Sequence, residues 1–518
     1  MSYSPLDNTL TVSKDNWDKR TGPSIGDSER IYGLRIFIKP WETDDTWLGE
    51  LLQHLPRNRS IIQLTIEFLR LAPNQRRHQL KWDIFHTIIP FIENNSNLTD
   101  IQLCGGTTSM LRSLSSALSS CKNKRLERIN LTRNQDEAGY REFFTSLNDY
   151  NNLREICVGA NKMWTEGVTI LSSLLKKPTS SICSLELNNS LDDEHIAILG
   201  NGLVGNKHVT NIDLWRNSSV TAVGWDRFSQ ALFHPECAIE TLRLVDTNLD
   251  DEGVTYVGYA LAVNKSIKSL VLTDNDTITQ GGLRGLLQCM RNPNTSLEEL
   301  VLKNCGINDE GIALIMEKVA QSVSLKTLNM SSNNSITSRG LRTIYHALFN
   351  CELSLEVIYL EQNWGINFGD LEEEDWLLYP RALCDKSSIN NTFYSNHTIQ
   401  SIELDICNEE YETDEFRDYR IDLESIIWCD IRKFLGMNYN ENKVKVARKK
   451  IMKSHFAGEA VDISVFALMP EALIPHAIEW IGRDKLGFSL MYQFVAGYPL
   501  DFSDSISSRA AKKLKQSS

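Results

Sequence analysis

The sequence predicts an α/β repeat solenoid with an inner parallel β-sheet and outer helices, closed at its C-terminal end by a helical cap. One observation is a strand pattern, LxxLxLxxN, that recurs through the middle of the chain. The other is a helix-start pattern that recurs in the second half of each unit. A single unit cannot bury its own apolar face, so stacked units must share one core. Because a helix is wider than the spacing of about 4.8 Å between strands, we expect the stack to curve into a horseshoe with the sheet inside.

The strand pattern covers 257 residues in nine intervals, which gives a mean period of about 28.6 residues. Side chains alternate along a strand, so the fixed apolar residues point into the core and the residues between them point to the opposite, concave face. Looser copies start at Ile31, Ile61 and Ile399. The regular copies begin at Leu98, Leu126, Leu153, Ile182, Val209, Ile239, Ile267, Leu297, Leu325 and Leu355.

Six helix starts are marked by a capping residue, and in five of them a glycine follows three positions later. Residues of these capping types accept hydrogen bonds from the free N–H groups of a first helical turn. The carboxylate pairs Asp192/Asp193 and Asp250/Asp251 fall in this slot, and we expect capping to account for them. The capping residues are Asp192, Thr221, Asp250, Thr279, Asn308 and Thr337, and the glycines are Gly224, Gly253, Gly282, Gly311 and Gly340.

The ninth position of the strand pattern alternates between Asn and a smaller residue, in step with spacings of 30 and 28 residues. An Asn there can bond backbone groups of its own turn and of the neighbouring turn. This two-type alternation resembles the ribonuclease-inhibitor-like leucine-rich-repeat family, over residues 98–366 and more loosely over 31–97. The resemblance implies the fold, and the family serves many different partners. The ninth residues are Asn161, Ser190, Asn217, Thr247, Asn275, Cys305 and Asn333.

The rest of the chain breaks the period. We expect a disordered N-terminus at 1–30, an N-terminal cap with irregular repeats at 31–97, regular repeats at 98–366, an irregular acidic insertion with the last repeat at 367–420, a helical C-terminal cap at 421–503 and a disordered basic tail at 504–518. Trp480, Phe488 and Tyr492 are expected in the core of the cap. The basic helix at 443–453 is interpreted as a solvated face, with a nuclear-import signal or a contact with anionic lipid as the alternatives.

The composition restricts location and partners. A net charge of -13 argues against general nucleic-acid binding, which needs an excess of Lys and Arg. The sequence shows no secretory signal and no apolar run long enough to span a membrane. The 11 cysteines are an odd number without paired spacing, which favours reduced thiols in the cytoplasm, with the nucleus also possible.

No catalytic motif is present. The chain lacks the nucleotide-binding pattern GxxxxGK[ST] as well as HExxH, GxSxG and paired-Cys zinc spacing. His234 and Cys237 are a lone His and Cys, and a metal site there would need further ligands from elsewhere. We therefore predict no enzymatic activity, no cofactor, no metal and no small-molecule substrate.

The leading functional hypothesis is a scaffold or adaptor that binds a protein partner of unknown identity on the concave face. The alternative is a regulator of a small GTPase, similar to the Ran GTPase-activating family, which shares this repeat type. That family's acidic C-terminal tail is absent, and no motif here places its functional residues. A substrate receptor for ubiquitination would need an adaptor-binding module, and none is visible.

The candidate binding residues are the side chains that the strand pattern leaves free of packing. Trp215 is the most conspicuous, because an indole on an exposed sheet has no packing reason to be there, and Trp and Arg often dominate interface energy. The simpler interpretation is that Trp215 lies flat on adjacent strands and that Arg216 merely pairs with Asp246. The first group is Glu186, Asp213, Trp215, Arg216, Arg243, Asp246 and Asp274, and a second cluster towards the C-terminal loop is Tyr359, Glu361, Gln362 and Trp364.

Overall fold

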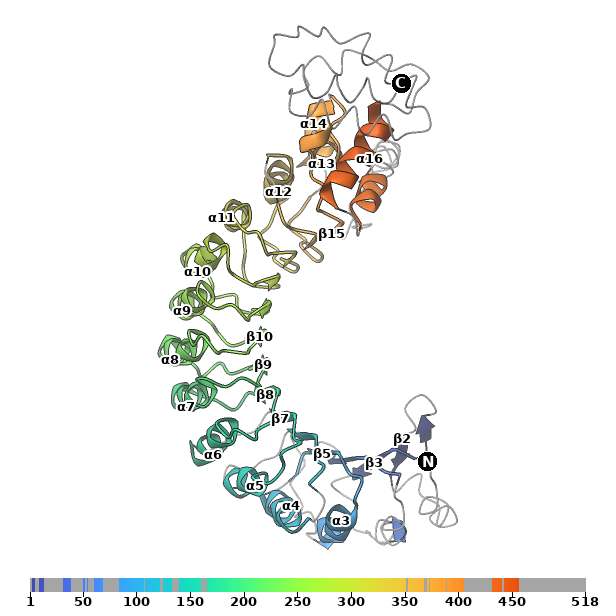
Figure 1. Ribbon diagram of the computed structural model, residues 1–518, viewed down its shortest axis with the longest axis vertical. Coiled ribbons are helices and arrows are strands. Elements are labelled where there is room, and N and C mark those ends of the chain that lie inside the picture. Colours follow the sequence, from blue (N-terminus) through green and yellow to red (C-terminus); the bar gives the residue numbers. More distant parts are fainter. Residues whose placement is uncertain are drawn as a thin grey trace, which may run out of the picture. The chain divides into compact units, whose positions relative to one another are not determined.

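The computed structural model contains two compact units, residues 1–306 and 307–518. The residues described are 2–4, 9–13, 31–38, 50–51, 54, 60–68, 83–106, 108–121, 124–132, 139–159, 165–350, 353–367, 370–371, 373–387, 389–404, 431–439 and 442–455. Trp480, Phe488, Tyr492, Asn161 and the tail at 504–518 therefore lie outside the described residues. In each unit, strands alternate with helices in the order strand, turn, helix (Figure 1).

The strands of the first unit lie side by side in sequence order. From β2 onward the pairing is parallel, whereas β1 is antiparallel to β2. The strands are β1 Ser2–Ser4, β2 Thr9–Val12, β3 Gly33–Ile38, β4 Gln63–Phe68, β5 Asp100–Cys104, β6 Arg128–Thr132, β7 Glu155–Gly159, β8 Ser184–Asn188, β9 Asn211–Asp213, β10 Thr241–Arg243, β11 Ser269–Val271 and β12 Glu299–Val301.

The helices of the first unit form a layer on one side of this sheet (Figure 1). The core lies between the two layers: Leu185 and Leu187 of β8 and Ile196 and Leu199 of α7 are all fully buried. The helices are α3 Asp83–Asn94, α4 Thr108–Ser120, α5 Tyr140–Ser146, α6 Thr165–Leu175, α7 Asp193–Leu203, α8 Ala222–Leu232, α9 Asp251–Leu261 and α10 Gln280–Leu286, followed by the 3-10 helix η4 Leu287–Arg291.

The second unit repeats this arrangement and ends in helices. Its strands, β13 Thr327–Asn329, β14 Val357–Tyr359 and β15 Ser401–Glu403, are parallel. Its helices are α11 Asp309–Val319, α12 Ser338–Asn350, α13 Glu373–Leu383, α14 Ile389–Tyr394 and α16 Lys443–His455. Within α16, Val446 and Ile451 are buried, and the buried Lys450 donates hydrogen bonds to the carbonyl oxygens of Leu383 and Asn396.

The structure confirms the predicted fold class, a repeat solenoid with a parallel sheet and flanking helices. It differs from the expectation at the N-terminus, where β1 and β2 lie inside the segment 1–30 that we expected to be disordered. The physical reason is that Leu10 and Val12 alternate along β2 and are both buried, so a strand there adds to the core. Among the described residues, no helix combines the length and apolar character that crossing a membrane requires.

The ninth-position asparagines bond backbone groups of consecutive turns, as the pattern predicts. The Asn275 amide oxygen accepts from the N–H groups of Thr247 at 3.1 Å and Leu249 at 3.0 Å. Its amide nitrogen donates to the carbonyl oxygens of Leu244 and Leu272, at 2.7 and 2.9 Å. Asn217 makes the same kinds of contact with the preceding turn. Each such Asn therefore joins two neighbouring repeats.

A second set of asparagines, which the sequence analysis did not single out, occupies the turn after some of the helices. Asn206 and Asn264 each stand three residues before the first residue of a strand pattern. The amide oxygen of Asn264 accepts from the N–H groups of Ser266 and Ile267, and its amide nitrogen donates to the carbonyl oxygen of Leu232. Both turns of every such repeat are therefore closed by a buried side-chain amide.

In each carboxylate pair at a helix start, the first carboxylate caps the helix and the second bonds the next repeat. This corrects the expectation that capping accounts for both members. Asp250 caps α9 by accepting from the N–H of Gly253 at 2.8 Å. Asp251 instead reaches the next repeat, where it accepts from the N–H of Thr279 at 2.6 Å and from its hydroxyl. A Cβ atom at Gly282 would lie 2.5 Å from the Asp251 Oδ1 atom, which explains the recurrent glycine.

Candidate functional site

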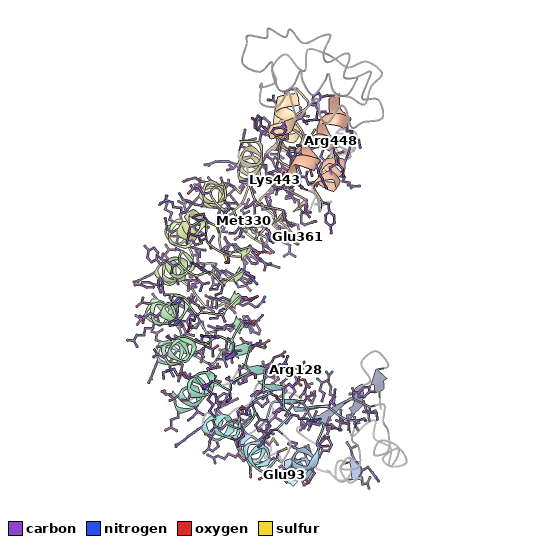
Figure 2. The ribbon with its side chains drawn as sticks, in the orientation of Figure 1. Glu93, Arg128, Met330, Glu361, Lys443 and Arg448 are labelled. Atoms are coloured by element: carbon purple, nitrogen blue, oxygen red, sulfur yellow. The ribbon has the colours of Figure 1, made fainter. Side chains whose placement is uncertain are left out.

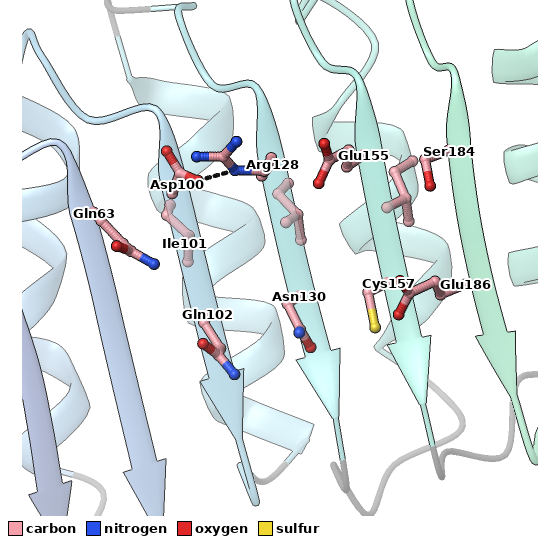
Figure 3. Close-up of a pocket in the computed structure, with 12 residues that line it drawn as sticks. Gln63, Asp100, Ile101, Gln102, Arg128, Asn130, Glu155, Cys157, Ser184 and Glu186 are labelled. Carbon is pink, nitrogen blue, oxygen red and sulfur yellow. Dashed lines mark hydrogen bonds and ion pairs between the residues drawn. The ribbon is translucent and has the colours of Figure 1, made fainter. Parts of the chain in front are cut away.

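The inner face, meaning the side of the sheet opposite the helices, carries polar side chains in register. On this face of β5 to β8, Asp100, Arg128, Glu155 and Ser184 form one row across the strands. A parallel row contains Gln102, Asn130, Cys157 and Glu186 (Figure 3). Arg128 projects from the sheet on the side away from the helices (Figure 2). These positions are free for recognition, because the apolar residues between them fill the core.

Further along the same unit, charged residues of β9, β10 and their turns form two ion pairs. The Arg243 guanidinium lies 3.0 Å from the Asp213 carboxylate, between the two strands. Arg216 donates to the Asp246 carboxylate at 2.9 Å, between the two following turns. All four side chains are at least partly exposed, so these pairs orient the surface more than they stabilise it.

Trp215 lies at the centre of this group. Trp215 is 40% exposed, and the Arg216 guanidinium lies 4.5 Å from the centre of its ring. The Trp215 N–H of the backbone donates to the side chains of Asn188 and Asp213, both at 3.0 Å. We call Asp213, Trp215, Arg216, Arg243 and Asp246 the Trp215 platform.

The structure places Trp215 in the turn that follows β9, which corrects its expected place on the exposed sheet. The reason is that β9 spans only Asn211–Asp213 before the chain turns. Arg216 is the next residue of this turn and has a left-handed backbone, with φ of 60°. The ion pair with Asp246 required by the simpler interpretation is present, and Arg216 also stacks on the exposed indole.

The other candidates of the first unit lie beside the platform. Glu186 on β8 is exposed and pairs in register with Asp213 of β9. Asp274, in the turn after β11, accepts a hydrogen bond from the Asn304 amide at 2.8 Å. These residues therefore extend the platform along the inner face in both directions.

The second predicted cluster belongs to the second unit. Tyr359 is on β14 and is partly buried, whereas Glu361 and Gln362 are exposed in the following turn. Trp364 is 54% exposed, and its backbone N–H donates to the Asn334 side chain at 3.2 Å. Within that unit the cluster again brings an exposed indole to the end of a strand.

A shallow hollow of 180 Å³ on the inner face was missed by the sequence analysis. Of the candidate residues predicted from the sequence, only Glu186 lines it. The others could have been found by applying the same rule, that residues between the fixed apolar positions face inward, to the earlier repeats. The lining residues are Gln63, Asp100, Ile101, Gln102, Arg128, Ile129, Asn130, Glu155, Ile156, Cys157, Ser184 and Glu186 (Figure 3).

Two groups that line the hollow, the Arg128 guanidinium and the Cys157 thiol, have raised pKa values. The Asp100 carboxylate accepts from Arg128, and this hydrogen bond raises the pKa of the guanidinium. Burial, followed by the nearby Glu186 carboxylate, raises the pKa of the Cys157 thiol. In the part of the chain that the structure describes, no group of three or more His, Cys, Asp or Glu side chains is placed to hold a metal ion.

Comparison with known proteins agrees with this geometry. The family model for the Leucine Rich repeat matches residues 263–287, 294–316 and 321–344. Mouse ribonuclease inhibitor is 29% identical over 209 residues, which cover 40% of this chain and 45% of that protein. The chain therefore contains leucine-rich repeats and is similar to ribonuclease-inhibitor-like proteins.

A second relative of this leucine-rich-repeat protein is the human NACHT, LRR and PYD domains-containing protein 5. It is 28% identical over 252 residues, which cover 48% of this chain and 21% of that protein. The chain thus spans less than half the length of both curated relatives. A chain from the solved structure titled "Crystal structure of Rad7 and Elc1 complex in yeast" matches over 72% of this chain and 87% of its own length at 17% identity, with a TM-score of 0.39, too low to support any argument.

Proposed function

We propose that this leucine-rich-repeat protein is a non-catalytic scaffold or adaptor that binds a protein partner on the inner face of its first unit, with the Trp215 platform at the centre of the contact. Its leucine-rich-repeat relatives support a protein-interaction role in general. The cysteines without paired spacing support a location in the cytoplasm or nucleus, and a net charge of -13 disfavours nucleic acid as the partner.

The observation that carries the proposal is the exposed pair of Trp215 and Arg216, in which Arg216 has a left-handed backbone conformation that is unfavourable for arginine. Most other non-glycine residues with a left-handed backbone in the first unit are Asn or Asp, which tolerate it, such as Asn189, Asp246 and Asp274. Arg216 adopts the same conformation, with φ of 60°. A left-handed arginine costs about 1–2 kcal/mol, and such strain is typically kept where it serves a function.

The surroundings suit a contact with a protein. Trp and Arg are the residue types enriched at energetically dominant positions of interfaces. The two ion pairs, Arg243–Asp213 and Arg216–Asp246, hold long side chains in place before a partner arrives. Less side-chain entropy is then lost on binding. In the second unit, Tyr359, Glu361 and Trp364 are proposed as further contact residues for the partner.

The test compares Trp215→Ala with Tyr259→Ala. Tyr259, on α9, is an exposed aromatic on the helical side, with 51% of its surface accessible. A partner is identified by affinity purification with the unaltered protein, and its affinity for each purified variant is then measured. Trp215→Ala is expected to weaken binding by about 2 kcal/mol or more, a typical loss at a dominant interface residue.

Tyr259→Ala is expected to bind as well as the unaltered protein, and both variants should keep its circular dichroism spectrum. If the double variant Trp215→Ala, Arg243→Ala captures the partner with unchanged affinity, the binding site is not on this face.

A further inference from the structure

The hollow on β4 to β8 has an excess of negative charge that its own chain leaves uncompensated. Its lining carries three carboxylates, Asp100, Glu155 and Glu186, and one guanidinium, Arg128, so its formal charge is −3 + 1 = −2. Arg128 is held by Asp100. Among the residues that the structure describes, no ion pair involves Glu155 or Glu186, and both are exposed.

This arrangement contrasts with the neighbouring strands on both sides. On β5 the inner-face carboxylate of Asp100 has Arg128 of β6, and on β9 that of Asp213 has Arg243 of β10. Between them, β7 and β8 carry Glu155 and Glu186. Arg128 lies in register with Glu155 but forms its ion pair with Asp100. In register, Glu186 lies opposite the like-charged Asp213 of β9, and directly opposed like charges destabilise a sheet, so the Glu186 carboxylate does not serve strand pairing.

One hydrogen-bond acceptor that lines the hollow has no donor. Asn130 lies between Gln102 and Cys157 in register, and its amide oxygen is buried with no partner among the described residues. A buried acceptor without a donor costs about 1–3 kcal/mol. The site therefore combines two carboxylates that form no ion pair among the described residues, one acceptor without a donor and a volume of 180 Å³.

We infer that the hollow receives an arginine side chain presented by the protein partner, whose guanidinium lies between Glu155 and Glu186. This inference rests on the proposed function and names the partner's chemistry at one point of the same inner face. A guanidinium is planar and offers five N–H donors, so it can bond carboxylates on two edges and an amide oxygen as well. A lysine ammonium is a compact and strongly hydrated point charge, which matches this spread-out set of acceptors less well.

Cys157 provides a local readout, because its partly buried thiol lines the hollow. The full chain is alkylated with iodoacetamide at mildly alkaline pH, and labelling at Cys157 and Cys237 is followed by peptide mass spectrometry. Because the thiolate is the reacting form and the pKa of the Cys157 thiol is raised, its labelling is slow and is followed over many hours. Cys237 is a partly exposed cysteine in the turn before β10, outside the hollow, and serves as the internal control. The probes are N-acetyl-arginine amide, its lysine analogue and its neutral citrulline analogue.

The arginine probe is expected to slow labelling of Cys157 about threefold at a concentration of about twice its Kd, by simple occupancy. Labelling of Cys237 is expected to stay unchanged. The citrulline probe, which keeps the shape without the charge, is expected to give no protection. Equal protection by the lysine probe would overturn the assignment to arginine, and absence of protection by the arginine probe would overturn the site.

The variants Glu155→Gln and Glu186→Gln are expected to raise the arginine concentration needed for protection by about threefold to tenfold, because each loses a charge-assisted hydrogen bond. Each variant is compared with itself without probe, because Glu186→Gln also changes the basal reactivity of Cys157. The matched control is Glu252→Gln on α9, which removes a carboxylate from the helical side and should leave protection unchanged. Unchanged protection in both hollow variants would contradict the inference.

These results separate the inference from the proposed function, since the labelling needs no partner. Loss of partner capture in Trp215→Ala without arginine protection would refute the hollow alone. Arginine protection with unchanged capture in Trp215→Ala would refute the role of the platform alone.

Discussion

Replacing Asn275 by Ala removes a buried amide that joins two repeats. The side chain is 1% exposed. The N–H groups of Thr247 and Leu249 lose their acceptor, whereas the carbonyl oxygens of Leu244 and Leu272 keep the hydroxyl of Thr247 and the thiol of Cys305 as donors. With about 1–3 kcal/mol for each of the two orphaned N–H groups, we expect the free energy of unfolding to fall by about 2–6 kcal/mol.

The assay is urea unfolding followed by far-UV circular dichroism, with Asn294→Ala as the matched control. Asn294 is an exposed asparagine in the turn between η4 and β12. The control should change the free energy of unfolding by less than about 0.5 kcal/mol, as is usual for surface substitutions. If Asn275→Ala unfolds at the same urea concentration as Asn294→Ala, the asparagine row does not stabilise the turns and this reasoning is refuted.

Three further predictions concern backbone strain, a buried charge and the C-terminal end. Arg216→Asn should keep or raise the urea midpoint, because relief of about 1–2 kcal/mol of left-handed backbone strain offsets the loss of an exposed ion pair. The affinity for the partner should fall, and a lower urea midpoint would contradict this reasoning. Burial lowers the pKa of Lys450 to about 7. Between pH 7 and the ordinary pKa of lysine, the unfolded chain therefore binds more protons than the folded chain, so the free energy of unfolding should rise with pH. Urea titrations at several pH values should show a smaller rise for Lys450→Met. Truncation after Ser401 removes α16 with its buried Val446 and Ile451, so it should give aggregates in size-exclusion chromatography, and a monomer with intact helical signal would refute that role.

The repeat fold could be predicted because it depends on spacing alone. Leu185 and Leu187 are buried as the strand pattern requires, and Asn275 makes the bonds that its position predicts. Features that depend on contacts between repeats could not be predicted in this way. The carboxylate of Asp251 adjoins a capping residue in sequence, and only the stacking of α9 beside α10 shows that it bonds Thr279.

The candidate site was predictable in its residue types and less so in its geometry. The strand pattern identified Asp213, Arg243 and Glu186 as inner-face residues, and the register places them there. The turn position of Trp215 depends on where β9 ends, which the pattern does not specify. The hollow depends on how small and large side chains alternate across several strands, and a single repeat contains no information on that.

The contacts between carboxylate and threonine have a consequence for how such a chain can change in length. The pairs are Asp193–Thr221, Asp251–Thr279 and Asp309–Thr337. Their members recur every 58 residues, since 251 − 193 = 58 and 309 − 251 = 58. Deleting or duplicating one repeat leaves an aspartate facing the wrong helix start, whereas doing so for two keeps every pair intact. Growth and shortening of this array, by gene duplication or by design, should therefore proceed in steps of two repeats.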